Sequence, residues 1–150
     1  MAFSPDGKLL VSVGKDNKAI LWDLRTSKEI RTLRGHVNGI SKVMFTPNGK
    51  KIVTGGDSRD QDLRIYDVKT GKELIHVKKG LGNSFESMAF TSDGKFVAAG
   101  TSYEMRVWNV ETGAEVYKLR DDRNWPDEQR INHTIEHITY SPDNSLIAIA

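Results

Sequence analysis

The sequence lacks cysteine, long apolar runs and an excess of charge of either sign, and each absence excludes a class of protein. Its 150 residues contain no cysteine, which excludes a disulfide framework and thiolate metal sites. No apolar run reaches the roughly 18 residues of a membrane span. The net charge of +2, from 22 basic and 20 acidic residues, does not indicate binding to nucleic acid or to an acidic membrane. The first residues do not have the pattern of a signal peptide, and we expect a cytoplasmic protein without cofactors.

What the sequence does contain is a repeated tight turn. An aromatic residue followed by a short polar turn occurs four times, at 3–8, 45–50, 90–95 and 140–145. In each copy Asp or Asn can accept local backbone hydrogen bonds, and Gly, or Asn144 in the last copy, is expected to take a positive φ. The aromatic residues that begin the copies are 42, 45 and 50 residues apart. Each copy therefore predicts the bend of an antiparallel hairpin.

A second marker has the same period. An aromatic residue followed by Asp or Asn lies at the centre of three apolar segments, 20–24, 64–68 and 106–110. Their aromatic residues are 44 and 42 residues apart. Two unlike motifs that share a period of about 40 to 45 residues, in a chain rich in strand patterns, predict the blades of a β-propeller.

The predicted fold is all-β: an arc of about three and a half four-stranded antiparallel blades, from a propeller of seven or eight blades. We expect blades at about 1–34, 35–78 and 79–120, and half a blade at 121–150. After a first strand ending at Phe3, the expected strands are 9–14, 19–24, 29–33, 40–45, 51–56, 63–68, 73–77, 85–90, 95–100, 105–110, 115–119, 135–140 and 146–150. Because this leaves half a blade, we expect a longer parent chain to supply the rest of the propeller.

These residues resemble the WD-repeat β-propeller family over essentially the whole chain. The resemblance rests on Ser12, Asp16 and Trp22-Asp23 in the first blade, and on the Gly35-His36 pair before the second. Three positions depart from the family pattern: Tyr66 stands for Trp, Asn109 stands for Asp, and Leu81 follows Gly80 where His is usual.

The resemblance also implies a structural hydrogen-bond network of His, Ser or Thr, Asp and Trp in a blade. In the second blade its members would be His36, Thr54, Asp60 and Tyr66. The two extra residues of the loop leave Asp57 and Asp62 as alternatives to Asp60. The first blade retains Ser12, Asp16 and Trp22. We expect these groups to stabilise the blades, because buried polar groups need partners.

Two patterns could indicate metal binding or catalysis. Residues 133–137 match H-x-x-E-H, but that zinc motif requires a helix, whereas the repeat places the segment at the start of a strand. In a strand its two His residues would lie roughly 13 Å apart. Carboxylates also cluster at Asp57, Asp60 and Asp62 and at Asp121, Asp122, Asp127 and Glu128, but Arg59 and Arg123 are interleaved with them. The sequence therefore predicts no catalytic, cofactor or metal residue and no enzyme.

Loop length indicates where partners would bind. The connector 120–134 is long for a compact domain and contains Trp125-Pro126, and 57–62 is a second insertion. Connections between strands two and three and between blades emerge at one end of a blade, so both insertions lie on one face. Insertions on one face of a repeat often mark its binding face. The partner-binding candidates are Arg59, Asn83, Arg123, Trp125 and Arg130.

The sequence thus predicts a protein-interaction scaffold, which binds proteins or peptides and neither nucleic acid nor membrane. The alternative is a propeller enzyme or sensor with a ligand or metal on its central axis, where polar side chains from several first strands would meet. The residues that could face the axis are Ser41, Lys42, Glu86, Ser87, Glu136 and His137.

Overall fold

The computed structural model describes residues 1–78, 83–102, 104–120 and 134–150. These residues form two compact units, Met1–Phe85 and Glu86–Ala150, and contain strands and turns but no helix. No helical span that could cross a membrane occurs within the described ranges. The all-β prediction is therefore confirmed, and the described residues form three four-stranded antiparallel sheets, of the kind that make propeller blades, and one two-stranded sheet.

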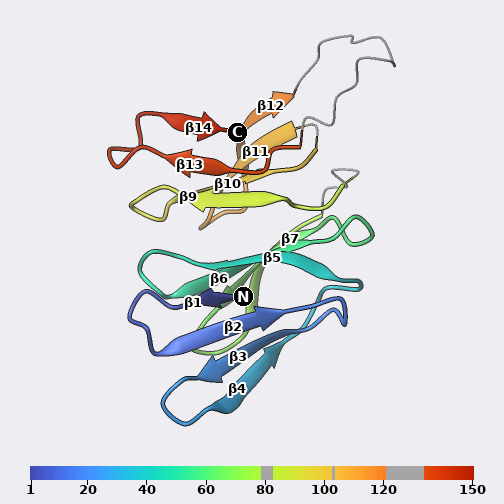
Figure 1. Ribbon diagram of the computed structural model, residues 1–150, viewed down its shortest axis with the longest axis vertical. Helices are drawn as coiled ribbons and strands as arrows, with labels where there is room; N and C mark the ends of the chain where they lie inside the picture. Colours follow the sequence, from blue (N-terminus) through green and yellow to red (C-terminus); the bar gives the residue numbers. More distant parts are fainter. Residues whose placement is uncertain (79–82, 103, 121–133) are drawn as a thin grey trace. The chain divides into compact units, whose positions relative to one another are not determined.

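The first unit contains two such blades, each with its strands in chain order (Figure 1). The first blade comprises β1 (Ala2–Phe3), β2 (Leu9–Val13), β3 (Ala19–Asp23) and β4 (Lys28–Leu33). The second comprises β5 (Ile40–Phe45), β6 (Lys51–Gly56), β7 (Leu63–Asp67) and β8 (Glu73–Val77).

The core of the first unit lies between its two blades. Buried side chains of both sheets form one cluster, made of Val11, Ala19, Leu21, Leu33, Ile40, Val43, Phe45, Ile52 and Tyr66. Strands of both blades are therefore apolar on the faces that meet, as expected for stacked repeats. Burying the side chains of such a cluster is the main favourable contribution to the stability of the unit.

The second unit has one four-stranded and one two-stranded sheet. The four-stranded sheet comprises β9 (Ser87–Phe90), β10 (Phe96–Gly100), β11 (Glu104–Asn109) and β12 (Glu115–Arg120). The smaller sheet pairs β13 (Ile138–Tyr140) with β14 (Ile147–Ile149). Its core contains Ala89, Ala98, Met105, Val107 and Ile138.

The repeated turns have the predicted backbone. Gly7, Gly49 and Gly94 have φ of 68°, and Asn144 has φ of 61°. In the last copy Asn144 has a second role, because its Oδ1 accepts a hydrogen bond from the Ser92 backbone N–H at 2.7 Å and its Nδ2 donates to Ser92 Oγ at 2.8 Å. Asn at the positive-φ position thus links two successive turns of the second unit, which Gly could not do through a side chain.

The strand bounds differ from the expected ones mainly where a blade begins. We predicted strands from 85 and 135, whereas β9 begins at Ser87 and β13 at Ile138. Within the first unit, Phe85 N–H donates to the Gly56 carbonyl at 3.4 Å, and its ring lies over Gly55. Ile135 likewise donates to the Thr101 carbonyl at 3.2 Å and lies over Gly100. Each of these two residues thus contacts the end of the second strand of a blade, and the next strand begins two or three residues later.

All three fourth strands share the same irregularity. The register between the third and fourth strands shifts immediately before the marker aromatic residue, at Leu21/Trp22, Ile65/Tyr66 and Val107/Trp108. The shift pairs each aromatic residue with a glutamate of the fourth strand, Glu29, Glu73 or Glu115. The bulge is therefore part of the repeat, and it determines which fourth-strand side chain lies beside the third strand.

Candidate functional site

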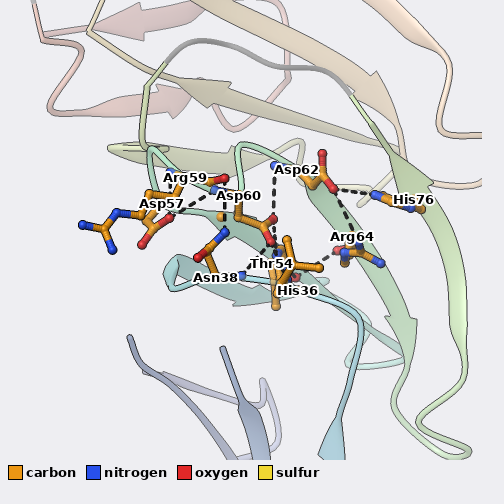
Figure 2. Close-up of polar contacts among 12 residues, drawn as sticks. His36, Asn38, Thr54, Asp57, Arg59, Asp60, Asp62, Arg64 and His76 are labelled. Carbon is orange, nitrogen blue, oxygen red and sulfur yellow. Dashed lines mark hydrogen bonds and ion pairs between the residues drawn. The ribbon is translucent and has the colours of Figure 1, made fainter. Parts of the chain in front are cut away.

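A buried hydrogen-bonded group joins three segments of the first unit. It lies at the end of the second blade that carries the inter-blade connector 34–39 and the 57–62 loop. His36 Nδ1 lies 2.6 Å from Asp60 Oδ1, and His36 Nε2 lies 2.7 Å from Thr54 Oγ1. The His36 and Asp60 side chains are 1% and 0% exposed. Figure 2 shows how His36, from the connector between blades, meets Thr54 of β6 and Asp60 of the following loop. Of the three aspartates left open by the sequence, Asp60 is the one that bonds His36.

The carboxylate of Asp60 also holds the backbone of the inter-blade connector. Its Oδ2 accepts hydrogen bonds from the N–H groups of Val37 at 2.7 Å and Asn38 at 3.2 Å. In return, Asn38 Nδ2 donates to the Arg59 carbonyl at 3.4 Å. Charge-assisted bonds of this kind are stronger than bonds between neutral groups. These hydrogen bonds therefore join the connector to the 57–62 loop.

The protonation states follow from this geometry. Burial lowers the pKa of His36 below its ordinary value of 6.5 and outweighs the Asp60 hydrogen bond, which raises it. Burial alone would raise the pKa of Asp60, but the bonds from His36 and from the Val37 and Asn38 N–H groups hold it below 3.8. At neutral pH the ring is thus neutral, with Nδ1–H donating to the Asp60 carboxylate and Nε2 accepting from the Thr54 hydroxyl. The group is hydrogen-bonded on both sides of the ring, as a structural role requires.

This assignment predicts that the fold loses stability in mild acid. Because the folded-state pKa of His36 lies below its unfolded value of 6.5, only the unfolded chain takes up this proton as the pH falls below that value. We expect the free energy of unfolding to fall below about pH 6.5, by at most about 1.4 kcal/mol per pH unit for one such group. Urea unfolding between pH 7.5 and 5.5 measures the slope.

The control for this prediction is His36→Gln, which removes the titrating ring. The variant is expected to be less stable at pH 7.5 but to show a flatter dependence on pH, because contributions from the other histidines are common to both proteins. An unchanged slope would contradict the assignment. Asp60 adds a separate loss at lower pH, since its stabilisation is complete above 3.8 and disappears as the pH falls through its lower folded-state pKa.

A cluster of ion pairs lies beside this group. Arg64 Nη1 is 2.5 Å from Glu73 Oε2, and Arg64 Nη2 is 3.4 Å from Asp62 Oδ2. His76 Nε2 also lies 2.6 Å from Asp62 Oδ2 (Figure 2). The Arg64 side chain is only 8% exposed, so these carboxylates compensate a buried charge. The arrangement recurs in the second unit, where Arg106 pairs with Glu104 at 2.6 Å and with Glu115 at 3.1 Å.

This cluster was missed by sequence reasoning, although a signal for it is present. Arg precedes the marker aromatic by two residues at both 64 and 106, and an acid precedes each Arg by two residues. Glu73 and Glu115 also recur at one position of the fourth strand. The period alone does not reveal the contact, because the bulge decides which residue of the fourth strand faces the arginine.

The first blade contains a smaller version of the network. Trp22 Nε1 donates to Ser12 Oγ at 2.9 Å, which joins two of the predicted residues. Asp16 is exposed, and its Oδ1 accepts the Lys18 backbone N–H at 3.4 Å within its own turn. In the second blade Tyr66 is 1% exposed at the position of Trp22, and its hydroxyl has no hydrogen-bond partner among the described residues. Burial raises the pKa of this hydroxyl. Asp16 and Tyr66 thus take no part in the hydrogen bonds that join the other predicted members of the two networks.

The partner-binding candidates are only partly covered by the described residues. Arg59 is exposed at the tip of the 57–62 loop, and Asn83 is half-buried. Arg123, Trp125 and Arg130 lie outside the described residues, as do Asp121, Asp122, Asp127 and Glu128. The proposed contact surface on the 120–134 connector therefore stays a prediction.

Two residues of the predicted axial set have structural hydrogen bonds. In the first unit, Ser41 Oγ lies 2.9 Å from the Gly56 carbonyl and 3.0 Å from that of Phe85. In the second, Ser87 Oγ accepts the Ile138 N–H at 2.9 Å. Lys42 and Glu86 are half-buried, whereas Glu136 and His137 are exposed.

The described residues offer no clear place for a metal ion. They include no group of three or more His, Cys, Asp or Glu side chains arranged to hold one. Of the H-x-x-E-H pattern, His133 lies outside the described residues, and 134–137 form no helix. Asp60 and Asp62 instead bond to His36, Arg64 and His76.

Comparison with known proteins agrees with this architecture. The model of the family described as "WD domain, G-beta repeat" matches residues 1–23 and 27–67. The guanine nucleotide-binding protein subunit beta of Solanum tuberosum is 33% identical over 81% of this chain and 33% of its own length. The WD repeat-containing protein 26 homolog of Drosophila melanogaster is 36% identical over 65% of this chain and 16% of its own length.

A third relative matches the chain from end to end. The periodic tryptophan protein 2 homolog of Schizosaccharomyces pombe is 26% identical over 100% of this chain and 19% of its own length. The chain thus spans a third or less of the length of these relatives. With the repeated blades, the Gly35-His36 pair and its bonds to Thr54 and Asp60, these matches lead to one conclusion: the chain belongs to the WD-repeat family.

Proposed function

We propose that this chain is a non-catalytic scaffold that binds other proteins through the loops at one end of its blades. The main supporting observation is that hydrogen bonds to Asp60 join the 57–62 loop to the inter-blade connector, while Arg59 of the same loop is exposed. A loop held in one conformation loses little entropy on binding, which favours affinity. Arginine and tryptophan are also enriched among residues that dominate binding energy.

The comparisons support the same proposal. One relative is by name a subunit, of a guanine nucleotide-binding protein, and another carries the WD repeat in its name. Because the chain spans a third or less of these proteins, the partners remain to be found by experiment. The alternative of an axial ligand has less support, since the hydroxyls of Ser41 and Ser87 already bond to backbone groups.

The test is the variant Arg123→Ala, Trp125→Ala in the longer parent protein. We expect this variant to lose at least one partner in an affinity capture compared with the unchanged protein, while its circular dichroism spectrum remains the same. Lys69→Ala is the matched control, since Lys69 lies on the turn between β7 and β8, at the opposite end of the blade. A folded variant that keeps every partner would refute the proposed binding face.

A further inference from the structure

At the end of the first unit that carries the 57–62 loop, two cations are exposed, whereas the carboxylates of that loop form hydrogen bonds or ion pairs within the protein. Asp60 accepts bonds from His36, Val37 and Asn38, and Asp62 bonds to Arg64 and His76. Asp57 Oδ1 accepts the Arg59 and Asp60 N–H groups at 2.9 and 3.2 Å. The carboxylates of Asp60 and Asp62, and one oxygen of Asp57, are thus directed to groups of the protein itself.

The cations of the same end are directed outward. Lys15 and Arg59 are exposed, and neither has an ion pair with another described residue. The guanidinium of Arg59 points away from the His36–Asp60 contact in Figure 2. A ligand that carries negative charge would therefore find here two exposed cations that form no ion pair within the described residues.

An exposed apolar side chain lies on the connector between the two blades. Val37 is 69% exposed, although the residue before it is buried. The backbone at Val37 is fixed by two hydrogen bonds. The Val37 N–H donates to Asp60, and the neighbouring Asn38 Nδ2 donates to the Arg59 carbonyl. An exposed aliphatic group on a backbone fixed in this way is suited to contact with an apolar side chain.

Backbone contacts bring the three segments together. The Asp57 N–H donates to the Gly39 carbonyl at 2.8 Å, and the Ile40 N–H donates to the Gly14 carbonyl at 3.0 Å. A Cβ atom on Gly39 would lie 3.3 Å from the Cα of Lys15. The segments that carry Lys15, Val37, Asn38 and Arg59 are therefore adjacent, and we call these four residues the loop patch.

We propose that the loop patch binds an acidic peptide segment of a protein partner, with an apolar side chain between its carboxylates. The proposal rests on the scaffold function and specifies its ligand. The carboxylates would pair with Lys15 and Arg59, the apolar side chain would contact Val37, and the Asn38 side chain would bond to peptide groups. A peptide fits better than nucleic acid, because Val37 offers nothing to a phosphate and nucleic-acid surfaces carry denser positive charge.

The test uses the uniformly ¹⁵N-labelled chain and the peptide acetyl-EDLDE-amide. Titration followed by heteronuclear NMR is expected to shift the amide signals of Lys15, Val37, Asn38 and Arg59, and binding is expected to weaken as NaCl is raised from about 50 to 300 mM. Arg59→Glu is expected to weaken binding about tenfold, and Val37→Ala about threefold or more. Lys50→Glu and Leu74→Ala are matched controls: Lys50 lies on a turn at the opposite end of the blade, and exposed Leu74 lies on β8.

Four results would overturn the proposal: no shift at the loop patch, equal binding of acetyl-KKLKK-amide, equal losses in the control variants, or tighter binding of a 12-base-pair DNA duplex at the same residues. Partner capture by the parent protein separates this inference from the scaffold function. If capture depends on Arg123 and Trp125 but not on Arg59 and Val37, the scaffold function stands and the loop patch is wrong. If capture depends on none of these residues, the proposed binding face fails as well.

Discussion

Replacing Asp60 with alanine is expected to lower the free energy of unfolding by about 3–5 kcal/mol, because it removes one member of a buried hydrogen-bonded group and leaves the others unpaired. The ring of His36 loses its acceptor at Nδ1, and the N–H groups of Val37 and Asn38 lose theirs. Asp60→Asn retains an acceptor oxygen without the charge, and we expect a smaller loss. Urea unfolding measures the energies, and hydrogen exchange of the Val37 and Asn38 amides reports the local effect.

Asp16→Ala is the matched control for this prediction. The family pattern assigns Asp16 to the network of the first blade, but the structure leaves it exposed within its own turn. We expect a change within about 0.5 kcal/mol, as for most surface substitutions. Equal losses for Asp16→Ala and Asp60→Ala would show that the hydrogen bonds of Asp60 are not the cause.

Replacing Gly35 with alanine is expected to cost about 2–4 kcal/mol, through backbone strain together with a disturbed buried ion pair. Gly35 has φ of 141°, a conformation that side chains rarely allow. A Cβ atom there would lie 2.6 Å from both Arg64 Nη1 and Glu73 Oε2. The Arg64 side chain is 8% exposed and has little space in which to move away.

Gly7→Ala is the control that measures the cost of backbone strain alone, without a steric contact. Gly7 also has a positive φ, 68°, but nothing lies within 4 Å of the position of its Cβ. We expect its replacement to cost only about 1 kcal/mol, from the backbone conformation alone. Urea unfolding of both variants gives the difference. If the two substitutions cost the same, the close approach of Gly35 to Arg64 and Glu73 contributes nothing.

The Gly35-His36 pair therefore has two separate structural functions. Glycine allows the connector to pass close to the Arg64–Glu73 ion pair, and histidine bonds to Thr54 and Asp60. The sequence indicated the second function through the resemblance to the family. It did not indicate the first, since Arg64 and Glu73 come from strands 29 and 38 residues further along the chain.

Most of the fold was predictable because its signals are local and periodic. Turn residues such as Gly49 and Asn144 require a positive φ whatever surrounds them, and their spacing divides the chain into blades. The strand starts at Ser87 and Ile138 were less predictable. They depend on the contacts of Phe85 with Gly55 and of Ile135 with Gly100, which join residues more than 25 positions apart.

The candidate site likewise has features that the sequence predicted and features that only the structure shows. His36, Thr54 and Asp60 were predicted from their positions in the repeat, but the longer loop left Asp57 and Asp62 as alternatives to Asp60. The structure gives each aspartate a different role. Asp57 accepts a backbone hydrogen bond within the loop, Asp60 is hydrogen-bonded to His36, and Asp62 pairs with Arg64 and His76.

The sequence by itself determined the all-β class, the four-stranded repeat and the positions of the turns, because periodic spacing and backbone preference are properties of short segments. Only the tertiary structure decided which carboxylate is buried, why Gly35 must be glycine, and that a loop rich in aspartate leaves Arg59 exposed. The first two outcomes depend on hydrogen bonds and close contacts between residues more than 20 positions apart. Such bonds form only when stacked strands bring separate loops within about 3 Å of one another, a distance that no local pattern specifies.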